Sequence, residues 1–301
     1  MKVTFIIGVI NNIKYYIKNP FKVTLFYLGV LNGVNAKFKK FGNLHLNKKD
    51  KNDHLLDALL LSSSKSYDEE QLQKVKNIIK KKDELVVEID GINFKHKEWV
   101  IMFELFIERE YSLLKKGNGK FIIDIGANKG YSSLYFANNG YNVIGFEPVG
   151  DVYNMGIENI NLNPKLKKRI KLINKAVSCK KGKTKIFTSN LIGSSGYSQY
   201  SHYFRDKKSE FEFVDTITIK DILSEYDFIP YGIKIDCEGC EVEILLNFDL
   251  SMFKIIYFEH HEGFTKINHK ILINKLKNQG FEIIGNDEFC DAIDVIAMSR
   301  E

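Results

Sequence analysis

The chain has 301 residues, of which 44% are hydrophobic and 27% are charged, and its formal net charge is +6. These values are ordinary for globular proteins, and the length allows two domains or one elaborated α/β domain. The small excess of positive charge neither requires nor excludes a nucleic acid or an acidic surface as partner. Four scattered cysteines are too few for a disulfide framework, so we expect a reducing, cytoplasmic environment.

The first part of the chain is expected to be a mostly helical extension. Residues 1–45 are apolar and basic, and we interpret them as helices packed on the domain that follows. The alternative is an amphipathic helix that lies on a membrane surface, which would make the protein membrane-associated. No run of 18 apolar residues is present, so a spanning helix is not expected.

Two local signals follow in this extension. Ser66 and Glu69 have capping-box spacing and predict a helix that continues to about Lys82. The pair Asp90-Gly91 predicts a small hairpin. The polar segment at 115–120 marks a boundary, which divides the chain into an extension at 1–115 and a second domain at 116–301.

From residue 121 the pattern alternates between short apolar runs and segments with helical spacing. The expected strands are 121–125, 142–147, 170–177, 231–236, 254–259, 281–284 and 293–298. The expected helices are 129–139, 149–161, 218–225, 239–246 and 266–279. This alternation predicts right-handed crossovers and a mostly parallel sheet, with ligands beyond the carboxyl ends of the strands.

The first two strand ends carry acids and glycines. The stretch FIIDIGANKGYSSLYF (121–136) places Asp124 at a strand end, with Gly126 and Gly130 in the turn before a helix. Its spacing lacks the middle glycine of the dinucleotide fingerprint, and a carboxylate beside the loop suits a cationic ammonium or sulfonium better than a dianionic pyrophosphate. Glu147 ends the next strand, where an acid accepts the two ribose hydroxyls of a nucleoside.

Two further strand ends are also acidic. In GIKIDCEGCEVEIL (232–245), a strand ends at Asp236, and Glu238 and Glu241 follow at the start of a helix. Another strand leads directly to Glu259 and His260. Four strand ends with carboxylates on one edge are more than sheet capping requires, so we interpret this edge as a ligand site.

The order of these segments resembles the FkbM family of S-adenosylmethionine-dependent methyltransferases. The matching pieces are IDIGANKGYSSLYFA, GFEP, NKAVS, VDTITIKDIL, IKIDCEGCEVEIL and YFEHH, which together cover roughly 60% of the chain in the family's order. The core D-x-E-G-x-E is the most specific of them. Cys237 and Cys240 fall on variable positions of this core, so their C-x-x-C spacing is interpreted as incidental rather than as a redox dithiol.

The resemblance implies a fold and a reaction. The fold is the Rossmann-like class I methyltransferase sheet of seven strands, mostly parallel, in the order 3-2-1-4-5-7-6 with the last strand antiparallel. The reaction is O-methylation of a hydroxyl on a sugar, glycan or secondary metabolite, with S-adenosylmethionine as donor.

The resemblance also implies where the cofactor lies. The turn after the first strand would surround the methionine half of the cofactor, and Glu147 would bind its ribose. The turn residues concerned are Asp124, Gly126, Asn128 and Gly130. The segment around Ala176 would lie beside the adenine.

Methyl transfer to a hydroxyl requires alignment and a base. His260 is the first candidate base because it follows a strand end and histidine titrates near neutral pH; Asp236 is the second. Further candidates for the substrate or a metal are Glu238, Glu241, Glu259 and Tyr197, the last in a Ser-, Gly- and Tyr-rich segment (189–204) interpreted as a substrate lid. A divalent cation that acidifies the hydroxyl is an alternative, with Asp236, Glu238, Glu259 and His260 as its ligands.

Three other functions stay open at this point. A nicotinamide-dependent oxidoreductase uses a similar sheet, although its glycine fingerprint is incomplete here. A nucleic-acid (RNA) methyltransferase is a second alternative, but the Asp/Asn-Pro-Pro-aromatic motif of amino-methylating enzymes does not occur, so no nucleic-acid partner is expected. The third is a cofactor-binding module without catalysis.

Overall fold

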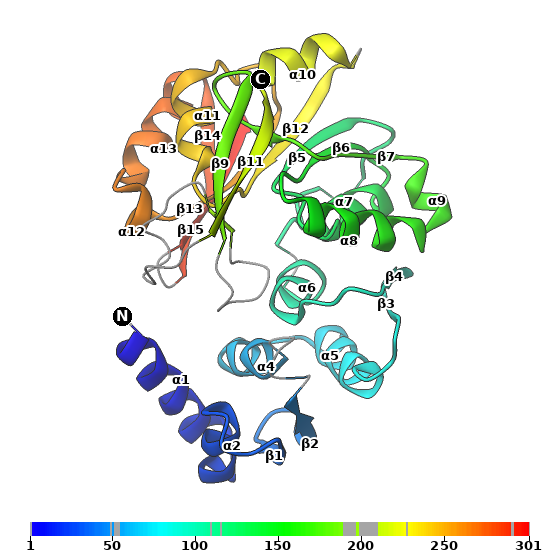
Figure 1. The fold of residues 1–301 in the computed structure, drawn as a ribbon, viewed down its shortest axis with the longest axis vertical. Helices are drawn as coiled ribbons and strands as arrows, with labels where there is room; N and C mark the ends of the chain where they lie inside the picture. The colour runs from blue at the N-terminus through cyan, green and yellow to red at the C-terminus, as the bar shows by residue number, and fades with distance from the viewer. Residues whose placement is uncertain are drawn as a thin grey trace. The chain divides into compact units, whose positions relative to one another are not determined.

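A computed structural model describes residues 2–48, 50, 55–108, 110–114, 116–188, 197–198, 210–226, 228–289 and 292–300. The chain divides into two compact units, Met1–Ser112 and Leu113–Glu301, which are coloured blue to cyan and cyan to red in Figure 1. Among the described helices, none is long and apolar enough to cross a membrane. Each unit is described by itself below.

The first unit mixes helices with two hairpins. In chain order it comprises α1 (Lys2–Tyr16), α2 (Pro20–Tyr27), β1 (Gly33–Phe38), β2 (Gly42–Asn47), α4 (Leu55–Ser64), α5 (Glu69–Lys81), β3 (Val87–Ile89), β4 (Ile92–Phe94) and α6 (Trp99–Phe106). The expectation of helix throughout 1–45 is therefore wrong from Gly33 onward. Val34, Ala36 and Phe38 alternate inward along β1, and Gly42 opens the return strand with a φ of +84°.

Two local predictions in this unit have different outcomes. The hairpin at Asp90-Gly91 is confirmed: both residues have positive φ and connect the paired strands β3 and β4. The capping box of α5 is made by Asp68 and Gln71, not by Ser66 and Glu69. Asp68 competes well for this position because a carboxylate accepts an amide hydrogen bond and also complements the helix dipole.

The second unit contains the predicted seven-stranded sheet, in the order β14-β15-β13-β12-β5-β6-β7. Its strands are β5 (Phe121–Ile125), β6 (Asn142–Phe146), β7 (Ile170–Ile173), β12 (Pro230–Ile235), β13 (Ile255–His260), β14 (Phe281–Phe289) and β15 (Ala292–Ser299). The five strands from β13 to β7 are parallel, and β15 is antiparallel to both of its neighbours. This is the strand order 3-2-1-4-5-7-6 that the family resemblance implied.

Helices connect the strands and supply much of the core. They are α7 (Tyr131–Asn138), α8 (Gly150–Asn161), α9 (Pro164–Lys167), α10 (Ile219–Glu225), α11 (Cys240–Asn247), α12 (Glu262–Thr265) and α13 (His269–Asn278). Leu245 of α11 and Leu276 of α13 pack in one buried cluster with Ile233 and Phe258 of the central strands. The apolar periodicity of these helices thus covers the sheet and leaves the carboxyl ends of the strands for other uses.

A second sheet branches from the first near the site. Its order is β10-β9-β11-β8, with β8 (Ala176–Val177), β9 (Gly182–Thr188), β10 (Tyr197–Ser198) and β11 (Glu210–Ile217). The prediction of one strand over 170–177 is wrong because Asn174 interrupts it: its side-chain amide donates to the carbonyls of Glu147 and Pro148. Most of the expected lid at 189–204, and the side chain of Tyr197, lie outside the described residues.

The contact between β5 and β12 demands a glycine at position 126. Gly126 has a φ of +76°, and a Cβ built on it would lie 1.7 Å from the backbone oxygen of Asp236. We predict that Gly126→Ala lowers the free energy of unfolding by more than about 2 kcal/mol, because the left-handed backbone and the clash add. Gly150→Ala is the control, since a Cβ there meets nothing within 4 Å. Equal chemical-denaturation curves for both variants would contradict this account.

Candidate active site

The carboxyl ends of four neighbouring strands form one edge of the sheet. Strands β6, β5, β12 and β13 lie side by side and parallel, so the residues that follow them meet at this edge. Glu147 follows β6, the glycine loop follows β5, Asp236 follows β12, and His260 ends β13. The sequence patterns that suggested a ligand site are therefore neighbours in space.

A buried lysine, Lys234, is at the centre of this edge. Its side chain projects from β12 and is 5% exposed. The ammonium donates a hydrogen bond to the carbonyl of Gly126 at 2.7 Å and lies 3.1 Å from a carboxylate oxygen of Asp236 and 3.5 Å from one of Asp124. One cation thus fixes three segments of chain. Sequence reasoning missed it, although a lysine between two isoleucines of a central strand needs buried anionic partners.

Asp124 turns into the protein rather than toward a ligand. It is fully buried, and one of its oxygens accepts hydrogen bonds from the hydroxyls of Ser132 and Ser133 at 2.7 and 2.6 Å. Its other oxygen faces Lys234. Asp124 therefore holds the first turn of α7 against β5, which differs from the predicted contact with the methionine half of a cofactor.

The loop between β5 and α7 is shaped by its own backbone. Asn128 has a φ of +50°, and its side-chain oxygen accepts the amide hydrogen of Lys129. Gly130 has a φ of +78° and begins α7, where its missing side chain leaves room for the carbonyl of Gly156. The Asn128 amide donates to Glu147 at 3.0 Å, so the loop is tied to the neighbouring strand.

Glu147 is a buried carboxylate with specific hydrogen bonds. One oxygen accepts from the Asn128 amide and the other from the Val149 amide at 2.9 Å. Burial raises the pKa of Glu147 to about 7, against the opposing effect of these two amides. Each carboxylate oxygen can accept a further hydrogen bond, so Glu147 retains capacity for a pair of hydroxyl donors.

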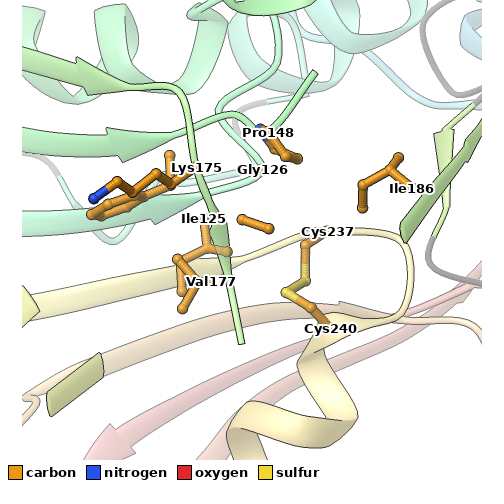
Figure 2. A pocket seen from close by; sticks show the side chains of 10 residues that line it. Ile125, Gly126, Pro148, Lys175, Val177, Ile186, Cys237 and Cys240 are labelled. Atoms are coloured by element: carbon orange, nitrogen blue, oxygen red, sulfur yellow. A yellow bond between two sulfur atoms is a disulfide. The ribbon is translucent and has the colours of Figure 1, made fainter. Parts of the chain in front are cut away.

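A small, mostly apolar cavity lies at the carboxyl ends of β5 and β6, and Phe146 and Pro148, the chain neighbours of Glu147, are among its lining residues (Figure 2). Including its open mouth it measures about 260 Å³, of which about 20 Å³ admits the centre of a water molecule. Gly126 and Ala176, both predicted at the cofactor site, line it. The other lining residues are Ile125, Phe146, Pro148, Lys175, Val177, Ile186, Cys237 and Cys240. Apolar walls of this kind suit the flat face of an aromatic base.

Cys237 and Cys240 form a disulfide across the turn that leads into α11, with Cα atoms 5.5 Å apart. The interpretation of this pair as incidental is therefore wrong: the turn into α11 places both sulfurs on one side, as C-x-x-C spacing permits. Figure 2 shows the bond on the side of the cavity opposite Val177. The redox state of this pair thus affects a wall of the cavity.

His260 is enclosed by protein. It is fully buried, with Nδ1 3.2 Å from an oxygen of Glu241 and Nε2 2.8 Å from the carbonyl of Ile267. The second oxygen of Glu241 accepts the Gly239 amide. His260 and Glu241 therefore join α11 to the loop after β13, and this arrangement does not offer His260 to an acceptor as the sequence predicted.

The next histidine is at the rim instead. Nε2 of His261 lies 3.3 Å from an oxygen of Glu238 and 3.3 Å from one of Glu259. Burial and the neighbouring acids raise the pKa of Glu238 well above its ordinary value, although His261 opposes the shift. Burial also tends to raise the pKa of Asp236, but Lys234, a hydrogen bond with Glu259 and the nearby His261 outweigh it and lower that pKa.

The predicted metal ligands do not assemble in the described part of the chain. His260 points away from Asp236, Glu238 and Glu259, toward Glu241. Among described residues, no group of three or more His, Cys, Asp or Glu side chains is arranged to hold a metal ion. Glu238 and Glu259 instead each pair with His261.

Residues 124–283, more than half of the chain, match the Methyltransferase FkbM domain. The chain belongs to the FkbM methyltransferase family. The match begins at Asp124 and includes every acidic strand end of the site. No curated protein matches the chain.

Solved structures similar to this FkbM methyltransferase are distant. The FkbM methyltransferase from Methylobacillus flagellatus KT is 13% identical, with a TM-score of 0.45 over 83% of this chain and 60% of that one. The METTL16 methyltransferase domain is 15% identical, with a TM-score of 0.45 over 77% and 79%. The precorrin-6y C5,15-methyltransferase from Geobacter metallireducens GS-15 is 13% identical, with a TM-score of 0.39 over 73% and 96%.

Removing the charge of Lys234 should destabilise this FkbM methyltransferase. Lys234→Met leaves Asp124 buried without its cation, and we expect a loss of about 3–5 kcal/mol in the free energy of unfolding. The control Lys183→Met breaks an exposed pair with Asp215 and should cost less than about 1 kcal/mol. Adding Asp124→Asn to Lys234→Met should recover part of the loss in urea denaturation. If Lys234→Met and Lys183→Met unfold at the same urea concentration, the contacts of the Lys234 ammonium do not stabilise the fold as described.

The raised pKa of Glu147 predicts a pH dependence of stability. A group whose pKa rises from 4.5 to about 7 on folding stabilises the fold fully below the lower value, and this contribution is lost as pH rises through the higher one. We expect a decrease of up to about 3 kcal/mol across this window. Urea unfolding at several pH values should show a shallower decrease for Glu147→Gln than for wild type or the exposed control Glu282→Gln. Equal slopes in all three proteins would refute the assignment.

Proposed function

We propose that this FkbM methyltransferase uses S-adenosylmethionine to methylate a hydroxyl oxygen on a sugar, a glycan or a similar secondary metabolite. The observation that carries the proposal is an apolar cavity at the carboxyl ends of β5 and β6, with Glu147 between two of its lining residues, Phe146 and Pro148. The family match supports methyl transfer as the reaction. The absent middle glycine and the buried Asp124 argue against a pyrophosphate, and hence against a nicotinamide cofactor.

The residues at this edge fit the parts of such a cofactor. Glu147 would accept the ribose hydroxyls, and the wall formed by Ala176 and Val177 would contact the adenine. Gly126 lines the same cavity. The enclosed part of the cavity, about 20 Å³, holds little more than one water molecule, so the adenine would occupy its open mouth.

The cofactor would supply a methyl group made reactive by its positive sulfonium. The protein must then hold the acceptor oxygen in line with that methyl group and take up the hydroxyl proton. We assign the proton transfer to the rim group of Glu238, Glu259 and His261, in which an oxygen of each glutamate lies 3.3 Å from His261 Nε2. The lowered pKa of Asp236 makes it a weak base, and its pairing with Lys234 suits it to positioning.

Two binding measurements test the cofactor. Calorimetry should show that S-adenosylhomocysteine binds wild type, and that NADH does not. Glu147→Ala should weaken S-adenosylhomocysteine binding at least about tenfold, because a hydrogen bond to a charged group is worth roughly 1.5–3 kcal/mol. Glu282→Ala is the matched control at an exposed position. Binding of NADH alone would replace the proposal with an oxidoreductase.

A labelling experiment tests the acceptor class. Purified protein and S-adenosylmethionine with a labelled methyl group would be incubated separately with extracted glycans, polar metabolites and RNA. We expect the label in glycans or metabolites, as an ether that survives mild base. Label confined to RNA would refute the proposed acceptor and favour the nucleic-acid alternative.

The two adjacent histidines should respond differently to the same substitution. His261→Asn should lower kcat by about 10²–10⁴-fold, since a positioned base contributes that much, while S-adenosylhomocysteine affinity and thermal stability stay near wild type. His260→Asn should instead lower the thermal unfolding temperature, because both of its ring nitrogens are bonded in the core. Unchanged turnover in His261→Asn would remove this residue from the mechanism.

A further inference from the structure

The N-terminal segment has a charge that the rest of the chain does not share. Residues 1–49 contain nine lysines and neither aspartate nor glutamate. The whole chain has 44 basic and 38 acidic residues, so the residues after 49 have three more acids than bases. The net positive charge of the protein therefore comes from this segment, and such asymmetry is typical of a chain region that meets a polyanion.

The backbone brings several of these lysines together. The Lys18 amide donates to the Lys37 carbonyl at 2.8 Å, and the Lys39 amide donates to the Tyr16 carbonyl at 2.9 Å. Ile17 and Phe38 form a backbone bridge between these lysines, and the side chains of Ile17 and Phe38 are both buried. Because alternate side chains of paired backbone point to opposite faces, Lys18, Lys37 and Lys39 point outward together, and all three are exposed.

The hairpin that carries Lys37 is hollowed on its outer face. Asn35, Lys37, Asn43, Leu44 and His45 line a depression of about 270 Å³. His45 Nδ1 lies 2.7 Å from the Asn35 side-chain oxygen, which fixes both groups. An ammonium with amide and imidazole groups beside it is suited to a phosphate group.

Large apolar side chains are exposed on the helix that precedes this hairpin. Phe21 is 74% exposed and Leu28, the residue that caps the end of α2, is 51% exposed. Their spacing of seven residues, about two helical turns, puts them on the same face of the helix. Val23 and Phe26 occupy the opposite, buried face. Val30, just beyond α2, is 67% exposed, and exposed Lys22 lies next to Phe21.

We propose that residues 13–45 dock on an anionic phospholipid bilayer. The exposed lysines and the hollow around Lys37 meet phosphate headgroups, and Phe21, Leu28 and Val30 enter the boundary between headgroups and acyl chains. The aliphatic residues decide between partners: a nucleic acid also attracts lysines, but it offers stacking bases rather than an apolar layer for Leu28 and Val30. This inference does not depend on the methyl acceptor or on the residues of the active site.

Vesicle sedimentation of the full chain tests the proposal. Vesicles of phosphatidylcholine with one part in three phosphatidylglycerol should bind the protein at least about tenfold more tightly than phosphatidylcholine alone, and added salt should weaken that binding. Equal binding to both vesicle types, or none to either, would overturn the proposal. Binding of the same residues to RNA but not to vesicles would overturn it in favour of a nucleic acid.

Matched variants locate the surface. A first variant changes Lys18, Lys22, Lys37 and Lys39 to Gln, and its control changes four exposed lysines of the second unit to Gln, namely Lys165, Lys167, Lys168 and Lys220. A second variant, Phe21→Ser with Leu28→Ser, is compared with Ile229→Ser, whose parent side chain is also exposed. We expect each test variant to lose at least about tenfold in vesicle affinity and each control to bind as wild type.

Circular dichroism and thermal unfolding show whether each variant is folded. The four lysines replaced by Gln are exposed, so that variant should lose charge without losing its fold. If test and control variants lose the same vesicle affinity, total charge or general surface hydrophobicity explains the binding, which contradicts a specific surface. Wild-type affinity in a folded test variant would also contradict it.

Discussion

The buried ammonium of Lys234 is the interaction on which the active-site edge depends. It pairs with Asp124 and Asp236 and donates a hydrogen bond to the carbonyl of Gly126, so one charge connects the ends of β5 and β12 with the glycine loop. A buried charge without such partners would be costly. The close approach of Gly126 to the backbone of Asp236 completes this contact and leaves space for no larger residue.

This constraint separates acids that build the site from acids that are available to a ligand. Asp124 and Glu241 are fully buried and bonded to protein groups, and they fix α7 and α11. Glu147 combines two backbone contacts with remaining acceptor capacity beside the cavity. The rim residues Glu238 and His261 are partly exposed and close to each other. A buried inner layer thus supports the residues to which we assign ligand binding and proton transfer.

Much of this fold was predictable because its strands are short apolar runs that end at acids and glycines. The strand order and the shared edge followed from that alternation together with the family resemblance. The choice between His260 and His261 did not, since the direction of a side chain at a strand end depends on the packing of the next loop. The roles of Lys234 and of the Cys237–Cys240 bond depend on three-dimensional contacts that spacing alone does not define.

The central claim is that this edge binds a nucleoside sulfonium donor through Glu147. A crystal structure with S-adenosylhomocysteine tests it most directly. We predict both ribose hydroxyls within hydrogen-bond distance of the Glu147 carboxylate, with the adenine against Ala176 and Val177. A ligand bound elsewhere, or a ribose that does not contact Glu147, would contradict the account.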